Sequence, residues 1–198
     1  MTRLSQSRKT VADYLTRPVV QLLAKLPITP NAITWVGFLV NVGAAVLIIA
    51  GHLFAAGFVV LFAGFFDILD GALARSTNRI TQFGGVLDST LDRLAEAVLL
   101  LGILVLYAKE QLVVEIIVVG LALVGSLLVS YIRARAEAIG LECQVGLFTR
   151  TERVIVLALG LLLSQIDYAL IIALSVIMVF SFITVGQRLL YVWRQTKN

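Results

Sequence analysis

Residues 53–92 read LFAAGFVVLFAGFFDILDGALARSTNRITQFGGVLDSTLD. The first fourteen residues carry no charge, and the run then continues into Asp67 and Asp70 without a helix breaker. After a short link, Asp88 and Asp92 open the next apolar run. Spacings of three and four residues put both members of each pair on one face of a helix. The stretch therefore predicts two adjoining antiparallel helices whose four carboxylates converge at one end.

The chain around this stretch is too apolar for a soluble domain. Of its 198 residues, 60% are hydrophobic and only 14% are charged, whereas about a quarter of a soluble domain is charged. One soluble core could not bury this much apolar surface, so lipid must cover part of it. We expect a single membrane domain over residues 1–198, with a juxtamembrane helix at about 7–25 and a transmembrane bundle at about 32–194.

Six hydrophobic runs predict an all-α integral membrane protein with six transmembrane helices. A full span needs about 20 residues, and several of the runs are shorter. Their polar ends must therefore continue into a protein-lined or aqueous cavity on one side of the membrane. The runs are Ala32–Ala50, Leu53–Phe66, Leu94–Ala108, Val113–Val129, Val154–Ser164 and Tyr168–Val185.

The basic residues predict the orientation of this bundle. With six spans, 15 of the 16 Lys and Arg residues fall on one side, and only Lys109 falls on the other. The positive-inside rule makes the basic side cytoplasmic. We therefore expect both termini and the aspartates to be cytoplasmic. The small size and the lack of an evident targeting segment suit a prokaryotic inner membrane.

The segment before the first span has a different pattern. Apolar residues such as Val11, Leu15 and Leu22 recur at helical spacing over residues 7–25, with basic residues between them. That pattern is typical of an amphipathic helix lying on the membrane surface.

Four carboxylates at a membrane boundary indicate a metal site. They would not all stay ionised at close range unless a cation lay between them. Oxygen ligands favour Mg²⁺, Mn²⁺ or Ca²⁺ over zinc or copper, and four carboxylates can hold two such ions. The alternative is a set of structural ion pairs with Arg75, Arg79 and Arg93. Two facing pairs with glycines between them, which allow a close backbone approach, favour the metal site.

The pattern Asp67-x₂-Asp70-Gly71-x₂-Ala74-Arg75-x₈-Gly84-x₃-Asp88-x₃-Asp92 resembles the complete signature of the CDP-alcohol phosphatidyltransferase family. The likeness extends over nearly the whole chain. It implies a homodimer, two divalent metal ions (Mg²⁺ or Mn²⁺) and a CDP-linked lipid donor, CDP-diacylglycerol or CDP-archaeol.

The resemblance also implies roles for individual residues. The metal ligands are Asp67, Asp70, Asp88 and Asp92, and Asp92 is also the catalytic base toward the acceptor hydroxyl. A metal-oriented carboxylate can take up a proton in this way. The residues implied for binding of the CDP-lipid are Asn31, Ala32, Ile33, Thr34, Asp70, Gly71, Ala74, Arg75, Thr81 and Gly84.

A second segment bears on the acceptor. Residues 130–153 resemble the phosphatidylinositol phosphate synthase branch of the family and its archaeal archaetidyl counterpart. That branch implies inositol phosphate as the acceptor, with Arg133, Arg153 and Arg188 holding its phosphate. A guanidinium group suits phosphate because it can donate two parallel hydrogen bonds to it. At the first of these positions the actinobacterial members have lysine.

Other functions remain open at this point. Glycerol 3-phosphate is another phosphorylated acceptor and would make the protein a phosphatidylglycerophosphate synthase. Serine or free inositol needs no phosphate clamp. A divalent-cation transporter would place its carboxylates near the bilayer midplane, and a non-catalytic scaffold leaves the four aspartates unexplained. We expect membrane lipid as a partner and no nucleic acid.

Overall fold

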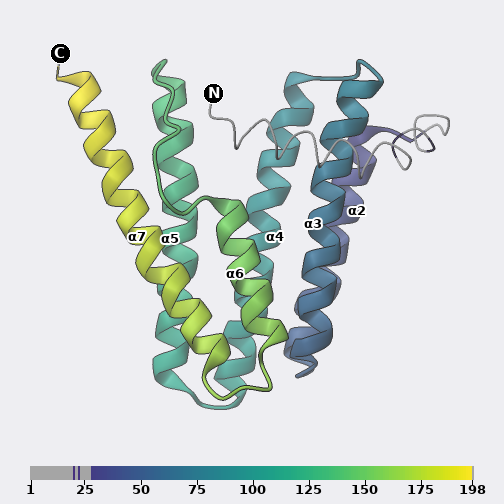
Figure 1. Cartoon of the computed structure of the whole chain (residues 1–198), viewed down its shortest axis with the longest axis vertical. Helices are drawn as coiled ribbons and strands as arrows, with labels where there is room; N and C mark the ends of the chain where they lie inside the picture. Colours follow the sequence, from purple (N-terminus) through teal and green to yellow (C-terminus); the bar gives the residue numbers. More distant parts are fainter. Residues whose placement is uncertain (1–19, 21, 23–27, 198) are drawn as a thin grey trace.

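The computed structural model describes residues 20, 22 and 28–197, and these residues form helices and connections without any strand. The predicted amphipathic segment at about 7–25 lies almost wholly outside the described residues. Six helices follow one another up and down along a common direction (Figure 1). They are α2 (Pro30–Ile49), α3 (Leu53–Ser76), α4 (Gln82–Lys109), α5 (Val113–Ala138), α6 (Arg150–Leu162) and α7 (Ala169–Thr196).

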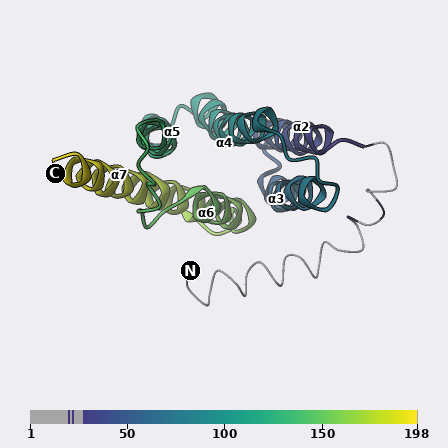
Figure 2. The same ribbon diagram turned by 90° about the horizontal axis from the view of Figure 1, so that it is seen from above.

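The six helices stand in two rows, α2, α4 and α5 in one and α3, α6 and α7 in the other (Figure 2). Contacts join them into a closed ring, in the order α2, α3, α6, α7, α5, α4 and back to α2. The two aspartate-bearing helices, α3 and α4, do not pack closely on each other, and both pack on α2. The expectation that they are direct neighbours is therefore wrong, and the space between their carboxylates is open to other side chains.

Small residues allow the helices to approach closely inside the ring. A Cβ added to Gly57 of α3 would lie 2.8 Å from Leu162 Cγ, and one added to Gly160 of α6 would lie 2.6 Å from Ala173 Cβ. Between helices in lipid, such close packing supplies much of the attraction. The contacts anchor α6 between α3 and α7 and so fix where its first residues lie.

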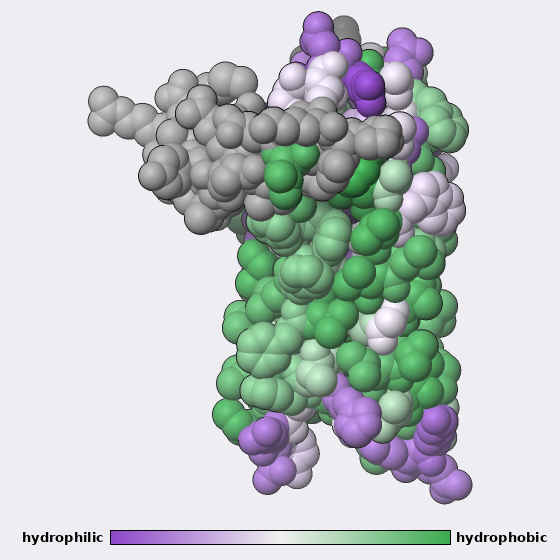
Figure 3. All heavy atoms as spheres, turned by 90° about the vertical axis from the view of Figure 1, so that its right-hand side faces the viewer, coloured by the Kyte–Doolittle hydropathy of each residue, from purple (hydrophilic) through white to green (hydrophobic). Residues whose placement is uncertain are grey.

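The outside of the bundle is apolar between two polar ends (Figure 3). Large side chains such as Phe58, Ile117 and Ile172 are more than half exposed there. Among the helices that the structure describes, four are long and apolar enough to cross a membrane, namely α2, α3, α5 and α7. This is the surface of a membrane protein, since lipid must cover it.

The other two helices differ from the predicted spans. Helix α4 has 28 residues, but its first half carries the charged residues of the site. Helix α6 has only 13 residues, about 20 Å at 1.5 Å per residue, which is shorter than a hydrocarbon core of about 30 Å. It is short because residues 139–149 run back down the bundle against α7, so that α6 begins part-way down (Figure 1).

Candidate active site

The four aspartates lie toward the same end of the bundle, as predicted from their spacing. Helix α3 continues through Gly71 to Ser76, so Asp67 and Asp70 lie about two turns before its end. Asp88 and Asp92 lie in the second and third turns of α4. The link at residues 77–81 connects the two helices at this end.

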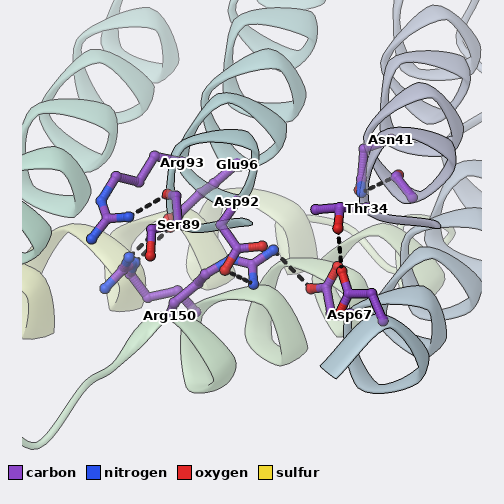
Figure 4. Close-up of polar contacts among 11 residues, drawn as sticks. Thr34, Asn41, Asp67, Ser89, Asp92, Arg93, Glu96 and Arg150 are labelled. Carbon is purple, nitrogen blue, oxygen red and sulfur yellow. Dashed lines mark hydrogen bonds and ion pairs between the residues drawn. The ribbon is translucent and has the colours of Figure 1, made fainter. Parts of the chain in front are cut away.

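The carboxylates of α3 and α4 are joined by an arginine from a third helix. Arg150 Nη2 lies 2.9 Å from Asp67 Oδ2, and its Nη1 lies 2.6 Å from Asp92 Oδ2. Figure 4 shows the guanidinium between the two aspartates. The sequence reasoning gave this residue no role beyond the positive-inside pattern.

A local signal explains the position of Arg150. Thr149 and Glu152 form a capping box, in which the Thr149 backbone N–H donates to Glu152 Oε2 at 2.9 Å. A Thr-x-x-Glu pattern before an apolar run predicts the start of a helix. It makes Arg150 the first residue of α6 and puts Arg153 one turn later on a nearby face.

The acidic residues fit a divalent cation, although they do not form a closed cage. In the part of the chain that the structure describes, no group of three or more acidic, His or Cys side chains has metal-binding geometry. The donors are nonetheless all oxygens, and two of them already share one cation, the guanidinium of Arg150. Asp70 is held in place by the Thr34 hydroxyl, which donates to it over 2.7 Å. Such a donor set suits Mg²⁺ or Mn²⁺.

A cavity of about 290 Å³ lies on one side of the aspartates, where the first turns of α2 and α4 meet the end of α3. Thr29 and Thr81 cap these two helices by accepting from the backbone N–H groups of Ala32 and Gly84. Helix N-termini carry partial positive charge and bind anions readily, and Arg75 and Arg79 add full charges. The cavity is therefore suited to a phosphorylated ligand.

Most residues that the resemblance assigns to the CDP-lipid line this cavity. Ala32 and Ile33 do not: Ala32 is exposed, and Ile33 is buried against Leu69 and Leu73. The cavity also includes residues that the sequence did not single out for the donor, namely Pro30, Arg79, Ile80, Gly85 and Asp88. The predicted residues in the lining are Asn31, Thr34, Asp70, Gly71, Ala74, Arg75, Thr81 and Gly84.

Gly84→Ala is expected to raise the KM for the CDP-lipid about tenfold. The new Cβ would lie 2.8 Å from Thr81 Oγ1 and 3.2 Å from Asn31 Oδ1, so the cap of α4 and the cavity wall would have to move. A misplacement of about 1 Å can cost about 10²-fold, so a smaller movement of the wall is expected to cost less. Steady-state kinetics with varied CDP-lipid measure the effect. Gly43→Ala is the control, because its Cβ would meet nothing within 4 Å; equal behaviour of the two variants would contradict the prediction.

A second cavity of about 240 Å³ lies on the other side of Asp92, between α4, α5, α6 and α7. All three arginines predicted for the acceptor phosphate line it, and two further arginines join them. The five are Arg93, Arg133, Arg150, Arg153 and Arg188.

The three predicted arginines differ in their surroundings. Arg153 is 1% exposed and binds Glu96 with both Nε and Nη2, at 2.5 and 2.8 Å. Arg188 is also buried, and it donates to the carbonyls of Val145 and Val129, which ties residues 139–149 to the bundle. Arg133 is about half exposed and pairs with Glu137 over 2.8 Å. Arg133 therefore contributes least to the stability of the fold, whereas the charge of Arg153 is neutralised by the buried Glu96.

Sequence comparison assigns this architecture to a family. The model of the CDP-alcohol phosphatidyltransferase family matches residues 27–186, a range that includes the first cavity and all of the second except Arg188. The chain belongs to this family. It is therefore an enzyme that handles a CDP-linked alcohol, as the resemblance of the aspartate pattern implied.

Individual relatives agree with this assignment. The chain is 36% identical to an archaetidylinositol phosphate synthase of Methanothermobacter thermautotrophicus over 91% of this chain and 94% of that protein. It is 39% identical to a phosphatidylinositol phosphate synthase of Mycobacterium marinum over 90% of this chain and 80% of that protein.

Solved structures show the same fold. The crystal structure of the Mycobacterium tuberculosis phosphatidylinositol phosphate synthase with CDP-DAG bound superposes with a TM-score of 0.85 at 36% identity, over 91% of this chain and 94% of that one. Its complex with manganese and citrate gives 0.83 at 37% identity, over 90% and 88%.

Proposed function

We propose that this enzyme transfers a phosphatidyl or archaetidyl group from a CDP-linked lipid to a hydroxyl of inositol phosphate and releases CMP. The observation that carries the proposal is a pair of cavities on either side of the aspartates. One contains the family's donor motif, and the other contains five arginines. The relatives named above are an archaetidylinositol phosphate synthase and a phosphatidylinositol phosphate synthase. A CDP-linked lipid suits the first cavity, and a phosphorylated acceptor suits the second.

The donor belongs in the cavity between α2, α3 and α4. Its pyrophosphate would lie at the N-termini of α2 and α4, near Arg75 and Arg79. Asp67, Asp70, Asp88 and Asp92 would hold two divalent ions, Mg²⁺ or Mn²⁺. When bound, these ions neutralise the pyrophosphate and stabilise charge on the attacking and leaving oxygens. CDP-diacylglycerol and CDP-archaeol differ only in the lipid portion, which stays in the bilayer.

Asp92 is the residue best placed to act as the base. It lines the arginine-rich cavity and belongs to the aspartate cluster at the same time. A hydroxyl held beside it loses its proton to the carboxylate while its oxygen attacks the phosphorus that carries the lipid. The bond from that phosphorus to the CMP oxygen then breaks, and CMP leaves.

The arginines select a phosphorylated acceptor. Five guanidinium groups surround about 240 Å³, and the same lining includes only two carboxylates, Asp92 and Glu137. This excess of positive charge favours a ligand that brings its own negative charge. Serine and free inositol bring none. Glycerol 3-phosphate does, and it is the alternative acceptor. The aspartates lie toward one end of the bundle, which does not favour a transporter with carboxylates at the midplane.

The same proposal includes six membrane crossings with both termini in the cytoplasm of a prokaryote. The helices alternate in direction from α2 to α7 (Figure 1). Residues 139–149, which bury Cys143 and Phe148 and are bonded to α7 through Arg188, would complete the crossing that the short α6 leaves unfinished. Lys109 is the one Lys or Arg at the opposite end of the described helices. The positive-inside rule then gives the orientation.

Two further parts of the proposal rest on the sequence pattern and on family membership, respectively. They are a single membrane domain over residues 1–198, with an amphipathic helix at about 7–25, and a homodimer. The mass of the purified protein in detergent, measured by light scattering, tests the homodimer.

Release of CMP by the purified protein tests the function. With CDP-diacylglycerol and Mg²⁺, we expect CMP with inositol phosphate and little with serine or free inositol. A chelator should stop the reaction, and Mn²⁺ should restore it. CMP with glycerol 3-phosphate alone would replace the acceptor. Absence of CMP with every acceptor would contradict the enzyme assignment.

Arg133→Ala is expected to raise the KM for inositol phosphate about tenfold and to leave the KM for the CDP-lipid unchanged. Its exposed i,i+4 pair with Glu137 contributes only about 0.3–0.5 kcal/mol, so the fold should be intact. Arg135→Ala, on the same helix outside the cavity lining, is the control. An equal change in both KM values would mean that the two cavities do not separate donor from acceptor.

A further inference from the structure

Arg150 is bound to the residues that the proposed function assigns to the metals. Its two terminal nitrogens contact one oxygen of Asp67 on α3 and one of Asp92 on α4, at 2.9 and 2.6 Å. The guanidinium therefore bridges two helices that do not pack closely on each other. A cation that uses the same two oxygens must displace it.

This arginine is incompletely satisfied where it lies. Its Nε is buried and has no hydrogen-bond partner, and a buried donor without a partner costs about 1–3 kcal/mol. The residue also lines two spaces at once. One is the acceptor cavity, and the other is a small crevice beside Thr34, Asn41 and Asp67. Arg150 thus lies on the boundary between the aspartates and the acceptor cavity.

The charges around Arg150 determine where it can move. On the cavity side it meets four further arginines, namely Arg93, Arg133, Arg153 and Arg188. The Arg153 charge is matched by Glu96, and the Arg133 charge by Glu137. A displaced Arg150 finds a new anion there only when a phosphorylated molecule enters the cavity.

We propose that Arg150 is an internal counter-ion that competes with divalent metal for Asp67 and Asp92, and that the displaced guanidinium binds the acceptor's phosphate. The inference rests on the proposed function, because it takes these aspartates as metal ligands. A divalent ion attracts two carboxylates more strongly than the singly charged guanidinium of Arg150 does. Metal binding therefore frees the guanidinium of Arg150, which can then bind a phosphate in the acceptor cavity.

This exchange couples the two sites. Metal raises the affinity for phosphate, and by reciprocity phosphate raises the affinity for metal. The acceptor then binds tightly only when the aspartates hold metal. The coupling favours an order of binding that protects the donor from attack before the catalytic site is complete.

Calorimetric titration of Mn²⁺ into the purified full-length protein, without lipid substrate, tests the competition. Arg150→Gln should bind Mn²⁺ about tenfold more tightly than the wild type, within the usual range of coupling between sites. The Mn²⁺ affinity of Arg150→Lys should lie between those of Arg150→Gln and the wild type, because one ammonium group cannot bridge both carboxylates as the bidentate guanidinium does. Arg135→Gln, which removes a charge outside the cavity lining, should match the wild type.

Arg93→Gln separates competition from a general loss of positive charge. Arg93 lines the same cavity, and its guanidinium is bonded to the Ser89 carbonyl rather than to Asp67. An equal gain in Mn²⁺ affinity for Arg93→Gln and Arg150→Gln would overturn the proposal. No gain for Arg150→Gln, in a variant with wild-type melting behaviour, would overturn it as well. If Arg150→Gln does not fold, Arg150→Lys decides the question in the same titration.

Inorganic phosphate tests the second half of the exchange. In the wild type, saturating Mn²⁺ should raise phosphate affinity about fivefold or more; in Arg150→Gln this gain should be lost. An equal gain in both proteins would show that Arg150 does not reach the phosphate. If the wild type binds no Mn²⁺ and releases no CMP, the proposed function fails and the inference fails with it. If the wild type does both and the variant matches it, only the role of Arg150 fails.

Discussion

Asp92→Asn is expected to lower the rate of CMP release by about 10³-fold or more. Loss of a general base alone costs about 10²–10⁴-fold, and Asp92 is also expected to hold metal. The amide keeps the size and one oxygen, so the helix packing should survive. The residue lies where the aspartate cluster meets the acceptor cavity, so no other described carboxylate combines both positions.

Two controls distinguish loss of the catalytic base from loss of the fold. The variant should keep the melting temperature of the wild type, and Asp167→Asn, at an exposed position between α6 and α7, should keep full activity. Wild-type turnover in Asp92→Asn would remove the residue from the base role. A rate that recovers at high Mn²⁺ would assign it to metal binding alone.

Removal of Glu96 or Arg153 is expected to destabilise the bundle more than any other single change considered. Both side chains are more than nine-tenths buried, and they form a bidentate ion pair between α4 and α6. Truncating one partner leaves the other charge buried and unpaired, which costs about 3–5 kcal/mol. Glu96→Ala and Arg153→Ala should therefore both unfold at clearly lower temperature, as measured by thermal melting in detergent.

A paired replacement separates stability from acceptor binding. Replacing a buried ion pair with apolar residues of similar volume is often neutral or stabilising. The double variant Glu96→Leu with Arg153→Met should therefore recover most of the melting temperature. Its KM for inositol phosphate should stay about tenfold or more above that of the wild type if Arg153 also binds the phosphate. A double variant with wild-type KM would make Arg153 purely structural.

Much of the fold could be predicted because the hydrophobic runs are long and unbroken. The first run was expected at Ala32–Ala50, and α2 spans Pro30–Ile49. The second was expected to continue past Phe66 into Asp67 and Asp70, and α3 continues beyond them to Ser76. Periodicity and breakers act over one or two turns, so the sequence carries this information directly.

The errors concern contacts between distant segments. A short link between α3 and α4 predicted direct packing, but α2 takes the place between them because both helices pack on it. The run expected at Val154–Ser164 forms a helix that begins four residues earlier, at Arg150, where residues 139–149 fold back on the bundle and are held by Arg188. Ala32 and Ile33 share a turn with donor-site residues, yet they face away from the cavity.

By itself, the sequence determined the membrane character, the end at which the charges gather and the position of the four aspartates at that end. Composition, charge sign and helical spacing can all be read without knowing how distant segments pack. It also brought Arg133, Arg153 and Arg188 into consideration as a group. Only the tertiary structure decided how these parts meet. It placed Arg150 between Asp67 and Asp92 and matched Arg153 with Glu96. An ion pair across 57 or more positions depends on how three helices pack, and no spacing within one helix encodes that.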